Sequence, residues 1–103
     1  MILGRVVGEL WATRRHAGVD GRKLLIIEPH GWYNPPFPVA HVIAVDTLGA
    51  GVGEDVVVCL GDPARRSLGS TWLPIEAAVM AIVDRIDVTS QAATTATGRK
   101  GAA

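Results

Sequence analysis

The sequence has little of what several common protein classes require. Its 103 residues include one cysteine, and its ten basic and ten acidic residues cancel to a formal net charge of zero. A single cysteine, Cys59, forms no internal disulfide, which favours a reducing compartment such as the bacterial cytoplasm. A neutral chain also lacks the concentrated positive charge of duplex-binding proteins and polybasic membrane anchors. We therefore expect neither nucleic acid nor membrane as a partner.

Long apolar segments are also missing. No run approaches the roughly 20 consecutive apolar residues that span a bilayer. The first residues, MILGR, lack the basic and then apolar pattern of a signal peptide. A local basic patch stays open, because Arg14, Arg15, Arg22 and Lys23 could lie together. The sequence otherwise predicts a soluble, intracellular protein.

No spacing of reactive residues predicts catalysis or metal binding. His16, His30 and His41 each stand alone in or beside connections, without the H-x-x-x-H or C-x-x-C spacing of zinc sites. The acidic residues are scattered, so no pair is committed to acid–base chemistry. Cys59 lies within the apolar segment 56–60, where a thiol usually serves as a small buried hydrophobe. We expect no enzyme, no cofactor and no metal site.

What the chain does contain is a series of short β patterns. Nearly half of the residues, 49%, are hydrophobic, which fits one domain with one core. Residues 2–13 alternate between a small apolar face and a mixed face, as in a half-buried strand. Gly4 and Gly8 on the apolar face favour a strand that bends sharply or is closely approached by another backbone. Further strands are predicted over residues 23–28, 41–46 and 54–60.

The connections between these strands differ in character. Residues 14–22 contain an Asp20-Gly21 turn signal, so the first two strands should form an antiparallel hairpin. The Leu-Leu-Ile-Ile run at 24–27 suggests burial of the second strand on both faces. Residues 29–38 hold four prolines with Trp32, Tyr33 and Phe37, which predicts a projecting loop. Its aromatic side chains either cover a barrel end or dock on a neighbouring subunit.

The last third of the chain is less uniform. Residues 62–69 predict a short helix, with Asp62 as N-cap, Pro63 at the first position and Gly69 at the end. Residues 75–86 carry apolar side chains at helical spacing but are rich in β-branched residues, so helix and strand both stay open. The composition after Val88 predicts a disordered tail over 89–103. Residues 1–88 then form one small, closed, five-stranded β-barrel with one or two short helices.

The segment 46–54, DTLGAGVGE, invites a phosphate-loop interpretation because glycine N–H groups can bind anions. It lacks the Lys-Ser/Thr pair of a P-loop and precedes a strand rather than a helix, so no helix dipole would help to hold a phosphate. Glycines instead allow a tight connection and close backbone approach between two apolar strands. This structural interpretation is the better one.

In its context the same segment resembles one family. Residues 43–58 read IAVDTLGAGVGEDVVV, which is similar to the V-A-V-D-x-x-G-A-G-x-G-E-x-V-x-V pattern of the pentameric vertex proteins of bacterial microcompartments. The segments MILGRVVG at 1–8, GRKLLII at 21–27, GDPAR at 61–65 and AIVD at 81–84 resemble the same family in order. Two departures are Asp62-Pro63 in place of a Ser-containing pair and Ala81 where glycine is common. The resemblance, of the carboxysome and ethanolamine-utilisation type, covers residues 1 to about 88.

The resemblance implies an OB-like barrel that forms a cyclic homopentamer and closes a shell of hexameric proteins in the bacterial cytoplasm. It also implies that a strand follows a turn at residues 74–77. Carried over by position, the loop that lines or supports an opening on the five-fold axis comprises Gly49, Ala50, Gly51 and Gly53. The candidate contacts to other subunits or shell proteins are Glu54, Arg65, Arg66, Trp32, Tyr33 and Phe37.

A second function stays open from the residues alone. A small barrel can bind single-stranded nucleic acid or another extended ligand. Trp11, Trp32 and Trp72 would then be stacking platforms, with arginines contacting the backbone. The zero net charge disfavours this alternative.

Overall fold

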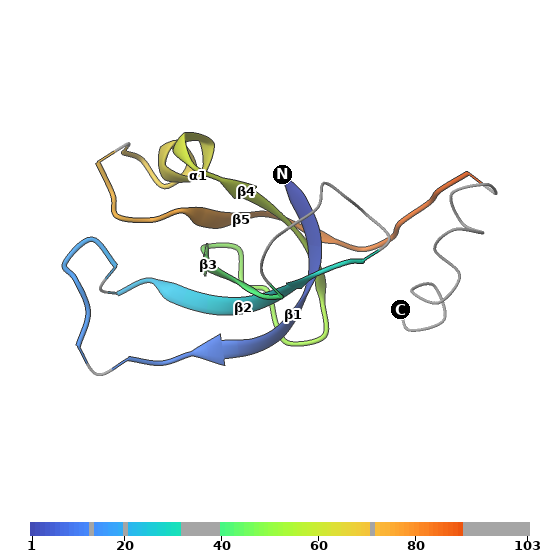
Figure 1. Cartoon of the computed structure of the whole chain (residues 1–103), viewed down its shortest axis with the longest axis horizontal. Helices are drawn as coiled ribbons and strands as arrows, with labels where there is room; N and C mark the ends of the chain where they lie inside the picture. The colour runs from blue at the N-terminus through green and yellow to red at the C-terminus, as the bar shows by residue number, and fades with distance from the viewer. Residues whose placement is uncertain (13, 20, 32–39, 71, 90–103) are drawn as a thin grey trace.

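The computed structural model describes residues 1–12, 14–19, 21–31, 40–70 and 72–89, which form a closed five-stranded barrel with one short helix (Figure 1). The elements are β1 (Ile2–Leu10), β2 (Lys23–Pro29), β3 (Val42–Asp46), β4 (Asp55–Leu60), α1 (Asp62–Ser67) and β5 (Ala77–Val83). The predicted small β-barrel is confirmed. None of the described helices is both long and apolar enough to cross a membrane.

The strands follow the order β1-β2-β3-β5-β4 around the barrel, and β4 closes it by pairing with β1. All pairings are antiparallel except the short parallel contact of β3 with β5, where Val45 lies opposite Ala78. The hairpin of β1 and β2 agrees with the turn signal, and Gly21 has the positive φ, 76°, that such a turn requires. The chain over residues 77–83 is a strand, as the resemblance implied.

One hydrophobic core fills the barrel. Inward positions alternate along each strand, as the period of two requires. The buried members of the core include Ile2, Val6, Leu25, Ile27, Ala44, Val56 and Val58, with Ala50 contributed by the β3–β4 connection. The expected burial of β2 on both faces is only partly realised, because Leu24 and Ile26 on its outer face are half-buried in the single chain.

Two features bend β1. A Cβ atom at Gly4 would lie 2.7 Å from the carbonyl oxygen of Glu28 and 2.6 Å from Ile27 Cγ2, so the close backbone approach expected there is present. The pairing of β1 with β2 skips one residue between Val6 and Gly8. Such a bulge increases local twist. The strand can therefore pair with β4 over its first half and diverge from it afterwards.

Helix α1 covers part of the outer surface of β4 and β5. Cys59 and Ala78 pack against Ala64 and Leu68, which makes Cys59 the small buried hydrophobe that its neighbours predicted. The predicted N-cap is wrong by one residue, because Gly61, at φ 67°, is the N-cap. Asp62 instead lies in the first turn, where its carboxylate accepts a hydrogen bond from Arg65. The predicted end is confirmed, since Gly69 has φ 103° directly after the C-cap Leu68.

Two long connections meet at one end of the barrel (Figure 1). A Cβ atom at Gly18 would lie 2.6 Å from Pro74 Cδ, so the β1–β2 connection and the segment before β5 are closely packed there. Trp32, Tyr33 and Phe37, and residues 90–103 of the predicted tail, lie outside the described residues.

Candidate functional site

The glycine-rich connection between β3 and β4 is folded around the carboxylate of Asp46. The Asp46 side chain is completely buried and accepts hydrogen bonds from three successive backbone N–H groups. Oδ1 accepts from Leu48 at 2.9 Å, and Oδ2 accepts from Gly49 at 3.1 Å and from Ala50 at 2.8 Å. Hydrogen bonds to an ionised acceptor are stronger than neutral ones. The first half of the loop is therefore fixed from inside the protein.

Lys23, from the start of β2, completes this arrangement. Its Nζ donates to the Ala50 carbonyl at 2.9 Å and lies 3.8 Å from Asp46 Oδ2 and 3.6 Å from Glu9 Oε1. The cation offsets the charge of the buried carboxylate and holds the loop carbonyl at the same time. A buried carboxylate without such partners would be strongly destabilising.

The second half of the loop is held by Glu54 and β1. Glu54 Oε1 accepts from the Gly51 N–H at 2.6 Å, and the Glu54 N–H donates to the Gly51 carbonyl at 3.1 Å. Val6 exchanges backbone hydrogen bonds with both flanks, donating to the Glu54 carbonyl at 2.9 Å and accepting from Gly53 at 2.8 Å. Glu54, expected as a contact to another subunit, thus also supports its own loop.

The four loop residues named from the sequence have different surroundings. Gly49 and Gly53 are exposed and have φ values of 87° and 92°, which only glycine adopts readily. Gly51 is half-buried and has an ordinary φ, and a Cβ there would meet only Glu54 Oε1, at 3.5 Å. Ala50 is fully buried in the barrel core, so within one chain it supports the loop from below.

Sequence reasoning missed two apolar side chains of this loop. Leu48 and Val52 are 50% and 62% exposed, and alternate with the glycines. It also missed the role of Asp46, although an Asp followed by a glycine-rich turn is a signal for side-chain-to-backbone bonding. The three N–H groups that a phosphate could have used already bind Asp46. This is the physical reason why a phosphate-loop interpretation fails here.

The two arginines proposed as contacts differ. Arg65 is largely engaged within its own chain, since it pairs with Asp62, donates to the Ile75 carbonyl at 2.9 Å and lies 3.6 Å from Glu76. Its hydrogen bond lowers the pKa of Asp62 below the ordinary value. Arg66 is exposed on the same helix. Arg65 therefore ties α1 to the segment before β5, and Arg66 is the more available side chain.

The expectation that each histidine stands alone is wrong for His30. This side chain is 3% exposed, and its Nε2 lies 2.8 Å from Asp55 Oδ1, which is also 3.4 Å from Arg5 Nε. The two partners are 25 residues apart in sequence, so no local spacing could indicate the pair. The contact joins the end of β2 to the start of β4, directly after the glycine-rich loop.

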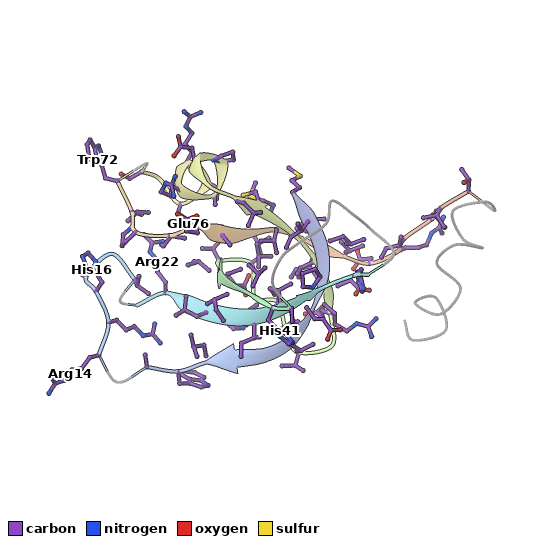
Figure 2. The ribbon with its side chains drawn as sticks, in the orientation of Figure 1. Arg14, His16, Arg22, His41, Trp72 and Glu76 are labelled. Atoms are coloured by element: carbon purple, nitrogen blue, oxygen red, sulfur yellow. The ribbon has the colours of Figure 1, made fainter. Side chains whose placement is uncertain are left out.

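Two tryptophans are strongly exposed. Trp11 is 79% exposed just after β1, and Trp72 is 93% exposed at the tip of the connection before β5 (Figure 2). Trp32 lies outside the described residues. A stacking platform for single strands would need such rings beside a basic surface.

Comparison with known proteins identifies relatives of the whole barrel. A family model described as ethanolamine utilisation protein EutN/carboxysome matches residues 1–84. The bacterial microcompartment shell vertex protein GrpN of Rhodospirillum rubrum is 39% identical over 87 residues, which cover 84% of this chain and 97% of that protein. The shell vertex protein EutN of Escherichia coli is 38% identical over 89 residues, covering 84% of this chain and 90% of EutN.

The fold of the barrel is equally similar to a solved relative. The structure of the GrpN pentameric microcompartment shell protein from Rhodospirillum rubrum superposes with a TM-score of 0.71 at 36% identity. The match covers 85% of this chain and all of that one. Sequence and fold therefore agree over the same part of the chain.

Proposed function

The chain belongs to the EutN/carboxysome family of microcompartment shell vertex proteins, and we propose that it forms a homopentamer at the five-fold vertices of a shell in the bacterial cytoplasm. The observation that carries the proposal is the similarity of the whole barrel to a solved pentameric shell protein. A layer of hexagonal units closes into a polyhedron only where five-fold units interrupt it. The role is therefore geometric, and no catalytic step is assigned to the protein.

One apolar surface available for assembly lies on the outer side of β1, β2 and β3, and we name it the hairpin face. In the strand register Ile26 lies opposite both Gly8 and Ile43, and Leu24 lies opposite Leu10. Val7, Leu10 and Ile43 are 41%, 37% and 45% exposed. The hairpin face comprises Val7, Leu10, Leu24, Ile26 and Ile43. Removing such apolar surface from water is favourable by about 25 cal/mol per Å², which offsets part of the entropy lost on association.

A second apolar region lies elsewhere on the barrel, where β1, β4 and β5 meet. Leu3 lies opposite Val57, and Val57 lies opposite Ala81, on the part of the sheet that α1 leaves uncovered. Met80 is 40% exposed at a register shift beside them. We name these four residues the β4 face.

Two unlike faces on one protomer suit a ring. When the hairpin face of one protomer packs on the β4 face of the next, the contact is heterologous, and such contacts close into rings when the rotation fits. A self-complementary dimer would instead use one face twice. We therefore assign the two faces to the two sides of the pentamer contact.

The glycine-rich loop is proposed to face the five-fold axis. Its exposed backbone at Gly49 and Gly53 and the less exposed Gly51 allow five copies to converge without large side chains. Leu48 and Val52 add an apolar rim to the opening, and Ala50 supports it from the core. The carboxylate of Asp46 keeps the loop in one conformation while the ring forms.

The remaining candidate residues are proposed to meet hexameric shell proteins. Arg66 is exposed on α1 and can pair with a carboxylate of a neighbouring tile. Arg65 positions the helix, and Glu54 and the loop residues Trp32, Tyr33 and Phe37 complete the set expected from the sequence.

Native mass measurement tests the pentamer, and co-expression with hexameric shell proteins tests the vertex role. Wild-type chain should give a five-fold mass and closed particles, and omitting it should leave open sheets, tubes or particles with gaps at their vertices. Ile43→Asp should abolish the pentamer, whereas Glu76→Gln, on an exposed side chain away from both faces, should not. A stable monomer at micromolar concentration, or equally closed particles without the chain, would overturn the proposal.

A further inference from the structure

The chain continues beyond the barrel after β5. Residues 84–89 leave the closed sheet and run outward as an extension (Figure 1). Their sequence, DRIDVT, holds two acidic residues, Asp84 and Asp87, and two apolar ones, Ile86 and Val88. Arg85 Nε and Asp87 Oδ2 form an exposed pair at 2.8 Å, and such pairs contribute at most about 1 kcal/mol. Within the described part of the chain, Asp84 has no ion-pair partner, so both carboxylates can take new ones.

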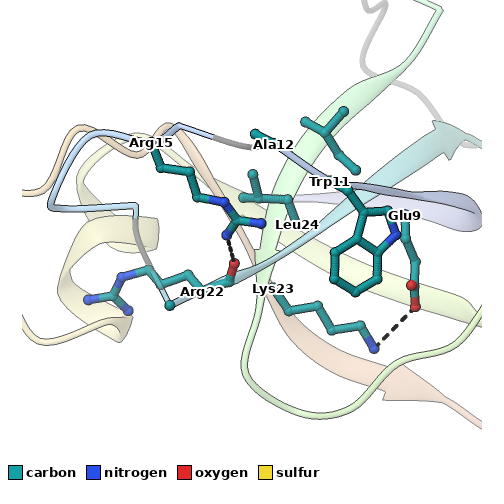
Figure 3. A pocket seen from close by; sticks show the side chains of 9 residues that line it. Glu9, Trp11, Ala12, Arg15, Arg22, Lys23 and Leu24 are labelled. Atoms are coloured by element: carbon teal, nitrogen blue, oxygen red, sulfur yellow. Dashed lines mark hydrogen bonds and ion pairs between the residues drawn. The ribbon is translucent and has the colours of Figure 1, made fainter.

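A groove on the β1–β2 hairpin has the opposite charge. It has a volume of about 530 Å³ and is lined by residues 9–12 at and just after the end of β1, by residues 21–24 at the start of β2, and by Arg15 between them (Figure 3). Trp11, 79% exposed, and Leu24 supply apolar surface. Arg15, Arg22 and Lys23 supply the charge, so three of the four basic residues that could lie together in the sequence do so.

The charges of this groove are not balanced by its own carboxylate. Lys23 is shared between Glu9 and Asp46. In contrast, the two guanidinium groups donate to backbone carbonyls. Arg15 donates to the Arg22 carbonyl at 2.6 Å, and Arg22 donates to the Gly18 carbonyl at 3.1 Å. Neither has a carboxylate partner among the residues that the structure describes. Since a guanidinium offers five N–H donors, each can still bind an acidic group.

An open strand edge adjoins the groove. Strand β1 pairs with β4 only from Ile2 to Arg5, whereas its pairing with β2 continues to Leu10. Over Val7–Leu10 no described strand lies on the second edge of β1. An unpaired edge can accept a further strand from another chain.

We propose that the extension of one copy, residues 84–89, docks on the groove and open edge of the next copy in the ring. Asp84 meets the guanidinium group of Arg15, and Ile86 and Val88, which share its side of an extended segment, pack on Trp11. The inference rests on the proposed pentamer and names a part of its contact. It agrees with the two faces, because the extension continues from β5 of the β4 face and the groove belongs to the hairpin that carries the other face.

A charge exchange in the full-length chain tests the docking. Asp84→Lys and Arg15→Glu should each weaken the pentamer. The protein concentration below which it dissociates should rise by at least tenfold, measured by sedimentation or mass photometry. The double variant should return to within about threefold of wild type, because the pair is restored with its charges reversed. Arg14→Glu, the same charge change as Arg15→Glu on an exposed neighbour that does not line the groove, should leave the dissociation within about threefold of wild type. The wild-type pentamer should dissociate more readily at high salt than at low salt, and this salt effect should be smaller in Asp84→Lys.

The outcomes separate this inference from the proposed function. If wild type is no pentamer, both are overturned. If wild type is a pentamer and Asp84→Lys dissociates like wild type, or the double variant is no better than the singles, the docking is wrong and the pentamer stands. If Arg15→Glu alone loses binding to hexameric shell proteins while the pentamer is unchanged, the groove binds a shell partner, and the assignment to the extension is wrong.

Discussion

Replacing Asp46 by alanine tests how the glycine-rich loop keeps its shape. The change leaves the N–H groups of Leu48, Gly49 and Ala50 without their acceptor and removes one of the two carboxylates beside Lys23. The three N–H groups are not affected equally. Ala50 is fully buried, so its N–H gains no water, whereas Leu48 and Gly49 are exposed and can be hydrated.

The cost follows from this difference. An unsatisfied buried donor costs about 1–3 kcal/mol, and each hydrogen bond that is replaced by a bond to water costs about 0.5–1.5 kcal/mol. We expect Asp46→Ala to lower the free energy of unfolding by about 3 kcal/mol, a large share of the roughly 5–15 kcal/mol of a small domain. Asp46→Asn keeps one carbonyl oxygen and should lose about half as much.

Urea unfolding at one fixed protein concentration measures the change, because the stability of an oligomer depends on concentration. Thr47→Ala, the exposed neighbour, is the matched control and should stay within about 0.5 kcal/mol of wild type. Hydrogen exchange adds a local measurement, since the Ala50 amide should lose protection in Asp46→Ala before the β1–β2 hairpin does. A change below 0.5 kcal/mol, or an Ala50 amide as protected as in wild type, would refute this account of the loop.

Further predictions concern the axis and the helix. Gly51→Trp should fold with near wild-type stability, because φ at Gly51 is ordinary and its Cβ position is free of backbone contacts. The large side chain should nevertheless block ring closure or the axial opening. If electron microscopy shows a pentamer with unchanged axial geometry, the loop lies elsewhere. Gly49→Ala should instead lower the free energy of unfolding by about 1 kcal/mol, because φ is 87° at this position. The hydrogen bond from Arg65 lowers the pKa of Asp62. The pair therefore stabilises the fold fully at pH values above the ordinary carboxyl pKa, and this stabilisation is lost as the pH falls through the lowered pKa. Asp62→Asn should remove that part of the acid-limb dependence in unfolding titrations, and an unchanged acid limb would contradict it.

Much of the barrel could be predicted from local patterns. The strands predicted at 2–13, 41–46 and 54–60 and the turn at Gly21 depend on neighbours one to four residues apart. All three strands and the turn are present, although β1 already ends at Leu10 and β3 and β4 each begin one residue later than predicted. The choice between helix and strand at 75–86 could not be made this way. The inward faces of Ala77 and Val79 pack in the barrel core while Ala78 packs under α1, and this burial on both faces hides the strand period.

By itself, then, the sequence determined the strand periods, the turns and, through the order of its motifs, the family. Only the tertiary structure decided which side chains meet: Lys23 with the Ala50 carbonyl 27 residues away, His30 with Asp55, and Arg5 with Asp55 50 residues away. It also placed Ala50 in the core and left Val7–Leu10 of β1, beside a basic groove, without a second neighbour among the described strands. Local propensity follows from each residue and its neighbours, whereas these contacts exist only once the barrel has closed and brought distant strands within bonding distance.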